Sequence, residues 1–162
     1  MSGTTANQDP ILPNHFRLEE LQTFLSFEHK TLSGVNYYLW VQDKTENASH
    51  FLFAMELQFD TGGRLLLSSG EDSAGISIIT DDVLIETAKR LEQMHGHPVI
   101  QSMPRSNQGL WANITGTSLE EVQLSRGEND LFRNDALMLR FEEAHILVRL
   151  VEAGDGLEIR EV

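Results

Sequence analysis

The sequence contains no cysteine, and only 12 of its 162 residues are lysine or arginine. The absence of cysteine excludes disulfides, thiolate nucleophiles and zinc sites built from thiolates. No stretch approaches the roughly 20 apolar residues that a membrane-spanning helix needs. The chain also does not open with the charged and then apolar segments of a secretory signal. We therefore expect a cytoplasmic protein.

Basic residues are scarce relative to acidic ones. The chain has 25 aspartate and glutamate residues and a formal net charge of −13. This charge repels nucleic-acid phosphates and anionic lipid surfaces, so we expect neither nucleic acid nor a membrane as a partner. The charge is compatible with a basic protein partner, and equally with a role in solubility alone.

The length and composition are typical of one folded domain. Hydrophobic residues make up 40 % of the chain and charged residues 23 %, which is ordinary for a globular protein of this size. The first 13 residues are mostly small and polar, and predict a flexible tail. We therefore expect a single compact domain over residues 14–162.

Alternating apolar and polar residues dominate the chain and predict strands. Thr80–His95 instead carries an apolar stripe at helical spacing, with Gly96 placed to end a helix. A short helix is also predicted within Asn14–Phe27. The expected fold class is α+β, with mostly antiparallel strands at residues 35–43, 51–59, 64–68, 75–79, 99–103, 110–115, 119–125, 136–142, 145–151 and 157–161, and with a polar loop at 126–134.

Two segments of the chain resemble each other. Met55–Asp60 reads MELQFD and Leu137–Glu142 reads LMLRFE, and a strand, a loop with glycine and acid, and another strand follow each. We interpret this as a possible internal repeat over residues 35–79 and 110–161. It predicts two similar β-meander units packed together, with the central helix at 80–95 between them. The alternative is that any two hairpins share such features.

Residues suited to chemistry are scattered. The Ser68–Gly75 loop lacks the spacing of a calcium loop and the basic residue of a phosphate loop. His95 and His97 could contribute to a metal site, although a histidine at a helix end also interacts favourably with the helix dipole. No serine lies in a nucleophile motif, and adjacent carboxylates on strands point to opposite faces. We expect no catalytic residue, no bound metal and no cofactor.

Aromatic residues are the weak candidates for binding. Tyr38 and Trp40 share one face of a predicted strand, and Trp111 lies in the second half of the chain. They could line a ligand-binding surface, or they could belong to the core.

Three functional hypotheses follow. The favoured one is a non-catalytic binding module, in one version an inhibitor of a basic protein, like an immunity protein against a nuclease toxin. The alternative is an enzyme that binds a small molecule in a pocket between the two β units. A third is a self-associating structural protein whose edge strands pair in a homodimer.

Overall fold

A computed structural model describes residues 14–42 and 50–162. This part of the chain forms an α+β structure in which the strand pairs are antiparallel, as the sequence predicts. In chain order the elements are α1 (Leu18–Phe27), β1 (Leu32–Val41), β2 (His50–Phe59), β3 (Arg64–Ser68), β4 (Ser77–Ile78), α2 (Asp81–His95), β5 (Ile100–Pro104), the 3-10 helix η1 (Gly109–Asn113), β6 (Leu119–Arg126), the 3-10 helix η2 (Glu128–Asp130), β7 (Phe132–Phe141), β8 (His145–Leu150) and β9 (Leu157–Glu161).

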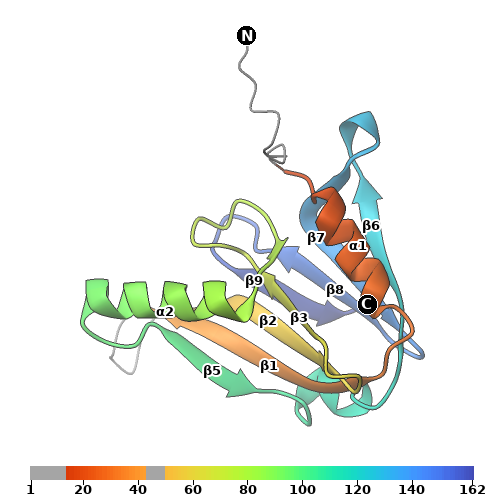
Figure 1. The fold of residues 1–162 in the computed structure, drawn as a ribbon, viewed down its shortest axis with the longest axis horizontal. Helices are drawn as coiled ribbons and strands as arrows, with labels where there is room; N and C mark the ends of the chain where they lie inside the picture. The colour runs from red at the N-terminus through yellow and green to blue at the C-terminus, as the bar shows by residue number, and fades with distance from the viewer. Residues whose placement is uncertain (1–13, 43–49) are drawn as a thin grey trace.

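The strands belong to one curled sheet of nine strands (Figure 1). Strands β1 to β4 pair in succession, and so do β6 to β9. The two series meet where Leu52 of β2 pairs with Leu157 of β9. At one end the sheet closes on itself, because Thr31 forms a bridge with Ser118 and the Leu32 N–H donates to the Thr117 carbonyl at 2.9 Å.

The interior of the curl is a single apolar core. It contains fully buried side chains from both series of strands, among them Leu57 and Leu65 from the first and Leu139 and Val148 from the second. Helix α1 contributes Phe24 to this core. We infer that burial of apolar surface on the inner faces of the two series of strands is what makes the sheet curl.

Helix α2 covers part of the outer face of the sheet, and its predicted limits are confirmed. The Thr80 side chain caps its first turn by accepting from the Val83 N–H, and Gly96 ends it in a left-handed conformation with φ of 76°. Leu84 packs against Phe53 and Leu66, in a second and smaller apolar cluster. The helix thus lies on the outside of the sheet and does not separate two β units.

A β-bulge in β2 places on two faces of the sheet residues that the alternating pattern of the sequence predicts on one face. The sequence predicts that Phe51, Phe53, Met55, Leu57 and Phe59 share a face. The register with β1 shifts between Leu52 and Ala54, so the face changes there. The first two residues pack in the α2 cluster, and the last three lie in the inner core.

Two other predictions of local structure are wrong. The segment 110–115 is not a strand, because its chain forms η1, which places Trp111 in the core. The segment 126–134 is not a continuous loop, because β6 extends to Arg126 and β7 begins at Phe132. Both segments are short and carry few alternating apolar residues, so tertiary packing decides their conformation.

The structure does not confirm two packed β-meander units. The strands form one sheet around one core, and no boundary between two sheets is present in the described residues. The predicted tail at 1–13 lies outside the described residues. No helix in the described part of the chain combines the length and the apolar character needed to cross a membrane.

Candidate binding groove

Helix α1 begins and is held in place through one buried carboxylate. Glu20 accepts a hydrogen bond from the Arg17 N–H at 2.9 Å, which satisfies a free donor of the first turn. Its other oxygen accepts from the Ile78 N–H, also at 2.9 Å, and this bond ties the helix to β4. Phe24 and Phe27 point into the core, whereas Leu18 and Leu25 are 68 % and 65 % exposed. The helix therefore has apolar surface on two sides, only one of which is buried.

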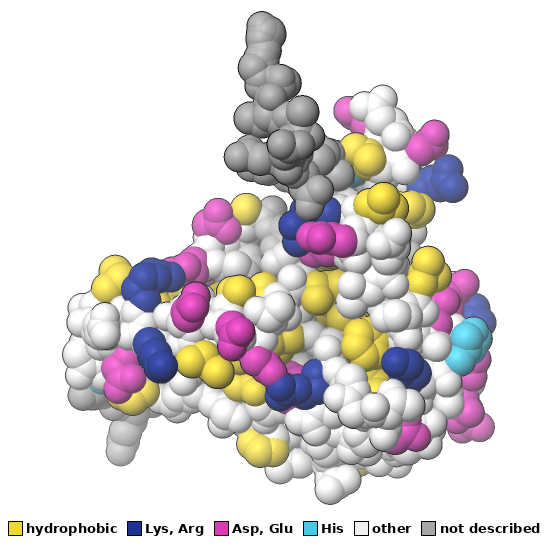
Figure 2. Space-filling view, viewed as in Figure 1, with side chains coloured by type: hydrophobic (Ala, Val, Ile, Leu, Met, Phe, Trp, Pro, Cys, Tyr) yellow, Lys and Arg dark blue, Asp and Glu magenta, His cyan; other side chains and the backbone are white. Residues whose placement is uncertain are grey.

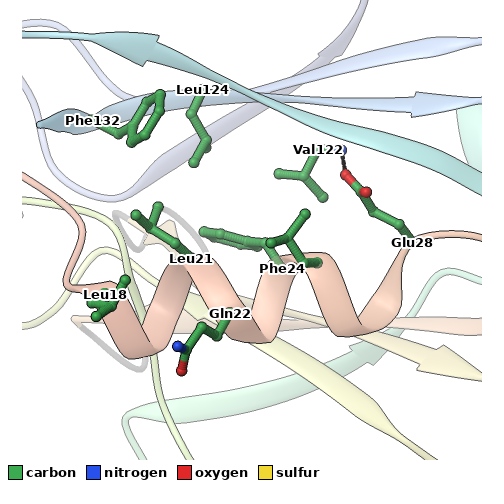
Figure 3. A pocket seen from close by; sticks show the side chains of 9 residues that line it. Leu18, Leu21, Gln22, Phe24, Glu28, Val122, Leu124 and Phe132 are labelled. Carbon is green, nitrogen blue, oxygen red and sulfur yellow. Dashed lines mark hydrogen bonds between the residues drawn. The ribbon is translucent and has the colours of Figure 1, made fainter. Parts of the chain in front are cut away.

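An apolar groove of about 360 Å³ lies between α1 and the strands β6 and β7 (Figure 3). Its volume is within the range of small ligand sites in proteins. Seven of its nine lining residues are apolar, and the other two are Gln22 and Glu28. The lining residues are Leu18, Leu21, Gln22, Phe24, Leu25, Glu28, Val122, Leu124 and Phe132.

The floor of the groove runs along a free edge of the sheet. Strand β6 is the last in the sheet order, and within residues 14–42 and 50–162 no strand pairs with its outer edge beyond Leu119. The Val122 N–H points away from β7, because it donates to a Glu28 carboxylate oxygen at 2.9 Å. Backbone groups alternate along a strand, so the N–H of Leu124 points the same way.

The groove ends near an acidic region of the surface. Leu119 pairs with Phe141, and the Asp60 N–H donates to the Thr31 carbonyl, so the β2–β3 and β7–β8 turns lie at the same end as the start of β6. These turns and the start of β6 carry Asp60, Glu120, Glu142 and Glu143. Figure 2 shows acidic side chains gathered at the right-hand edge of the molecule. The acidic end therefore adjoins the end of the groove that carries Glu28.

A second groove, of about 390 Å³, lies between α2 and the outer face of the sheet, and its two charged side chains, Arg64 and Asp81, are paired with each other. Arg64 bonds to the buried Glu56 at 2.9 Å and also forms an ion pair with Asp81 of α2. Gln58 donates to the other oxygen of Glu56 at 2.8 Å. We interpret this network as the contact that holds the start of α2 against β3.

The three aromatic candidates from the sequence do not come together. Trp111 is 1 % exposed and donates from Nε1 to the Tyr37 hydroxyl at 2.7 Å, so it is a core residue. Trp40 packs against Phe51 in the α2 cluster, with ring centroids 5.3 Å apart. Tyr38 lines the groove beside α2.

The tyrosine that receives the Trp111 bond has a shifted pKa. Burial raises the pKa of Tyr37 above its ordinary value, and this effect exceeds the opposing effects of the Trp111 hydrogen bond and of the nearby Arg105 charge. The neutral hydroxyl is therefore the form that the fold stabilises.

The histidines considered as metal ligands have ring centroids 6.1 Å apart. His97 contacts the carbonyl of Pro98 at 3.2 Å. Among the described residues, no group of three or more histidine, cysteine or acidic side chains is arranged to hold a metal ion.

The groove residues were only partly visible in the sequence. Leu18, Leu21 and Leu25 occur at helical spacing, which predicts an apolar helix face but not which part of it stays uncovered. No sequence signal marked β6 as an edge strand.

No family model matches this chain, and comparisons with curated proteins and with solved structures found no match either.

Proposed function

We propose that this protein is a non-catalytic binding module for a basic protein, and that the groove between α1 and β6 is its binding surface. The observation that supports this proposal most is the uncovered apolar groove beside an acidic end of the molecule. Burying Leu18 and Leu25 under a partner would supply affinity, because both side chains are largely exposed in the free protein.

The charge supports a basic partner in particular. A net charge of −13 speeds the encounter with a cationic protein and slows the encounter with an acidic one. Asp60, Glu142 and Glu143 are exposed, and none of them takes part in an ion pair among the described residues. They are thus available to a partner's lysine and arginine side chains. Inhibition of such a partner, as by an immunity protein, is one version of this function.

Binding to purified small basic nucleases and to acidic proteins of similar size tests the proposal. We expect calorimetry to detect a complex with a basic protein that weakens as salt rises, and none with the acidic set. Leu25→Asp places a charge in the groove and should weaken the complex at least about tenfold. Val83→Asp is the matched control, since Val83 is an exposed apolar residue on the other helix. Equal binding by both variants would place the interface elsewhere, and no complex with any basic protein would refute the function.

We also infer that the two series of strands descend from one repeated unit. Strands β2 and β7 both span ten residues, and both end in a buried phenylalanine, Phe59 and Phe141, followed by an acidic turn. Superposition of the two series in a crystal structure tests this inference, and unrelated strand geometry would refute it.

A further inference from the structure

We propose that the groove binds an extended segment of the basic partner as an added strand, paired with the backbone of β6 at residues 121–124. This inference rests on the proposed function and specifies how the partner is held. Strand addition at a free sheet edge is a common mode of peptide recognition, in which backbone bonds give affinity and alternate side chains give selectivity.

The backbone of β6 offers the groups that an added strand needs. The Val122 N–H is the first donor on the free edge, and it is occupied by the carboxylate of Glu28. The N–H and the carbonyl of Leu124 lie two residues further on and face the same side. No hydrogen bond to them from a neighbouring strand is present in the described part of the chain. Glu28 thus accepts a bond that a neighbouring strand would otherwise accept.

The usable edge is short and has defined ends. The register between β6 and β7 shifts between Leu119 and Glu121, and again between Leu124 and Arg126. Bulges interrupt edge pairing, so regular pairing is confined to the segment between them. At about 3.4 Å per residue this segment spans roughly 14 Å, which suits a ligand strand of about four or five residues.

The walls of the groove select side chains on one face of that strand. Val122 and Leu124 form the floor, and Leu21 and Leu25 of α1 face them across the groove (Figure 3 shows Leu21 and both floor residues). Alternate residues of a bound strand would enter the space between the helix and β6. The other residues would face outward, where the groove imposes no apolar requirement. The ligand therefore has apolar residues at every second position.

Charge complementarity indicates a basic ligand. Glu28 alone among the nine lining residues is charged, and the acidic end of the molecule adjoins it. One of its oxygens is bonded to the edge of β6, and the other has no hydrogen-bond partner in the described structure. A lysine or arginine at the end of the strand nearest Glu28 would meet this carboxylate.

A capped peptide that alternates valine and lysine over about eight residues is the probe. We expect it to bind the full chain and to protect the Leu124 amide from hydrogen exchange. The Gln123 amide is an internal control, because it faces β7 and should be protected in both states. An acidic peptide that alternates valine and glutamate should not bind.

Two N-methylated versions of the probe separate backbone pairing from side-chain contact. One carries N-methyl groups on the valine amides and the other on the lysine amides. Only one of these sets faces β6 in a paired strand, so one version should lose binding at least about tenfold and the other should retain it. Equal affinity of the two versions would overturn strand addition.

A substitution in β6 gives the matching test on the protein. Leu124→Pro removes the outward N–H without removing a bond to β7, and proline is tolerated at such edge positions. Leu124→Ala removes the same side chain and keeps the N–H. We expect the proline variant to bind the probe about tenfold more weakly than the alanine variant, with both folded by circular dichroism.

Three other experimental outcomes would identify a different occupant of the groove or a different mode of binding. If the Leu124 amide is protected in the absence of peptide, and this protection increases with protein concentration, a second copy of the protein occupies the edge. If the protection is independent of concentration, a segment of the same molecule occupies it. Both overturn this inference. A salt-sensitive complex with a basic nuclease that is unaffected by Leu124→Pro would overturn strand addition while leaving the proposed function intact. Failure of every basic protein and of the probe would refute both.

Discussion

At the scale of single residues, two buried glutamates of this protein, Glu20 and Glu56, are hydrogen-bonded and hold elements together. Glu20 joins the start of α1 to β4, and Glu56 joins β2 to β3 and, through Arg64, to α2. A buried carboxylate without partners would destabilise the folded state by several kcal/mol, so the native structure needs these hydrogen bonds. Neither role is visible from sequence, because both glutamates lie in ordinary polar positions of their patterns.

Replacing Glu20 by alanine should destabilise the protein by about 2–4 kcal/mol, because the Arg17 and Ile78 N–H groups would lose their acceptor. Urea unfolding measures this change. Glu19→Ala is the control, since the Glu19 side chain is 56 % exposed and should change stability by less than about 0.5 kcal/mol. Equal effects of the two substitutions would show that Glu20 does not hold α1 against β4.

Tyr37 gives the protein a stability that depends on pH. Its pKa in the folded protein is raised above the ordinary value of 10.0, so the folded state keeps its proton at a pH where the unfolded state has lost it. This contribution is fully present below pH 10 and is lost as pH rises through the folded pKa. Unfolding free energy should therefore fall more steeply above pH 10 in the native protein than in Tyr37→Phe.

The same variant has a separate effect at neutral pH. Tyr37→Phe removes the acceptor for the buried Trp111 Nε1–H, which should cost about 1–2 kcal/mol. Urea titrations at pH 7 and at several values above pH 10 separate the two effects. Parallel pH profiles for the variant and the native protein would contradict the assignment to Tyr37.

At the scale of elements, the sequence predicts regular structure well and its interruptions badly. Alternation of apolar and polar residues predicts most strands of the sheet, and the apolar stripe at helical spacing, together with its capping residues, predicts α2. The bulge at Phe53 changes which face the first residues of β2 occupy, and no local pattern signals it. Likewise, η1 replaces a predicted strand because Trp111 packs in the core.

The candidate binding groove is likewise only partly predictable from local sequence patterns. The spacing of Leu18, Leu21 and Leu25 predicts a helix, but its position against the edge of β6 depends on contacts between distant parts of the chain. The Glu28 bond to Val122 is one such contact, since it joins residues that are far apart in sequence. The aromatic candidates failed to converge for a related reason, because they face opposite sides of one sheet.

The α2 cap provides a test at this scale. Thr80→Ala should lower the unfolding free energy by about 1 kcal/mol, because the Val83 N–H loses its side-chain acceptor. Thr80→Ser keeps an acceptor oxygen and should stay close to the native value. Calorimetric melting of the three proteins measures the difference, and an alanine variant as stable as the native protein would show that the cap contributes nothing.

At the scale of the whole molecule, one core joins the two series of strands. Within the described residues, the strands of the two series pair directly only between β2 and β9, at Leu52 and Leu157, next to Gly156. A Cβ atom at Gly156 would lie 2.5 Å from the Leu52 carbonyl oxygen, and the backbone there has φ of +86°. Only glycine fits this conformation at this distance. The shared core then requires both series to unfold together.

Gly156→Ala should therefore destabilise the whole molecule by about 2–4 kcal/mol, through strain and through displacement of β2. Gly62→Ala is the matched control, because Gly62 also has positive φ but faces open space, and it should cost only about 1 kcal/mol. Urea unfolding followed by tryptophan fluorescence and by circular dichroism should give coincident transitions. Separate transitions would contradict a single cooperative core.

The groove beside α1 connects this architecture to the proposed function. The sheet closes at one end through residues 31–32 and 117–118, and beyond that point the edge of β6 is left beside the helix. The same arrangement that completes the core thus leaves one short edge, one apolar groove and one acidic surface next to each other. The proposed binding surface consists of this combination.

Intermolecular nuclear Overhauser effects between the bound valine–lysine peptide and the full chain test this claim most directly. Contacts from peptide backbone protons to residues 121–124 of β6, together with contacts from valine methyl groups to Leu21, are the predicted result. Contacts confined to the groove beside α2, or to side chains without any to the β6 backbone, would contradict it.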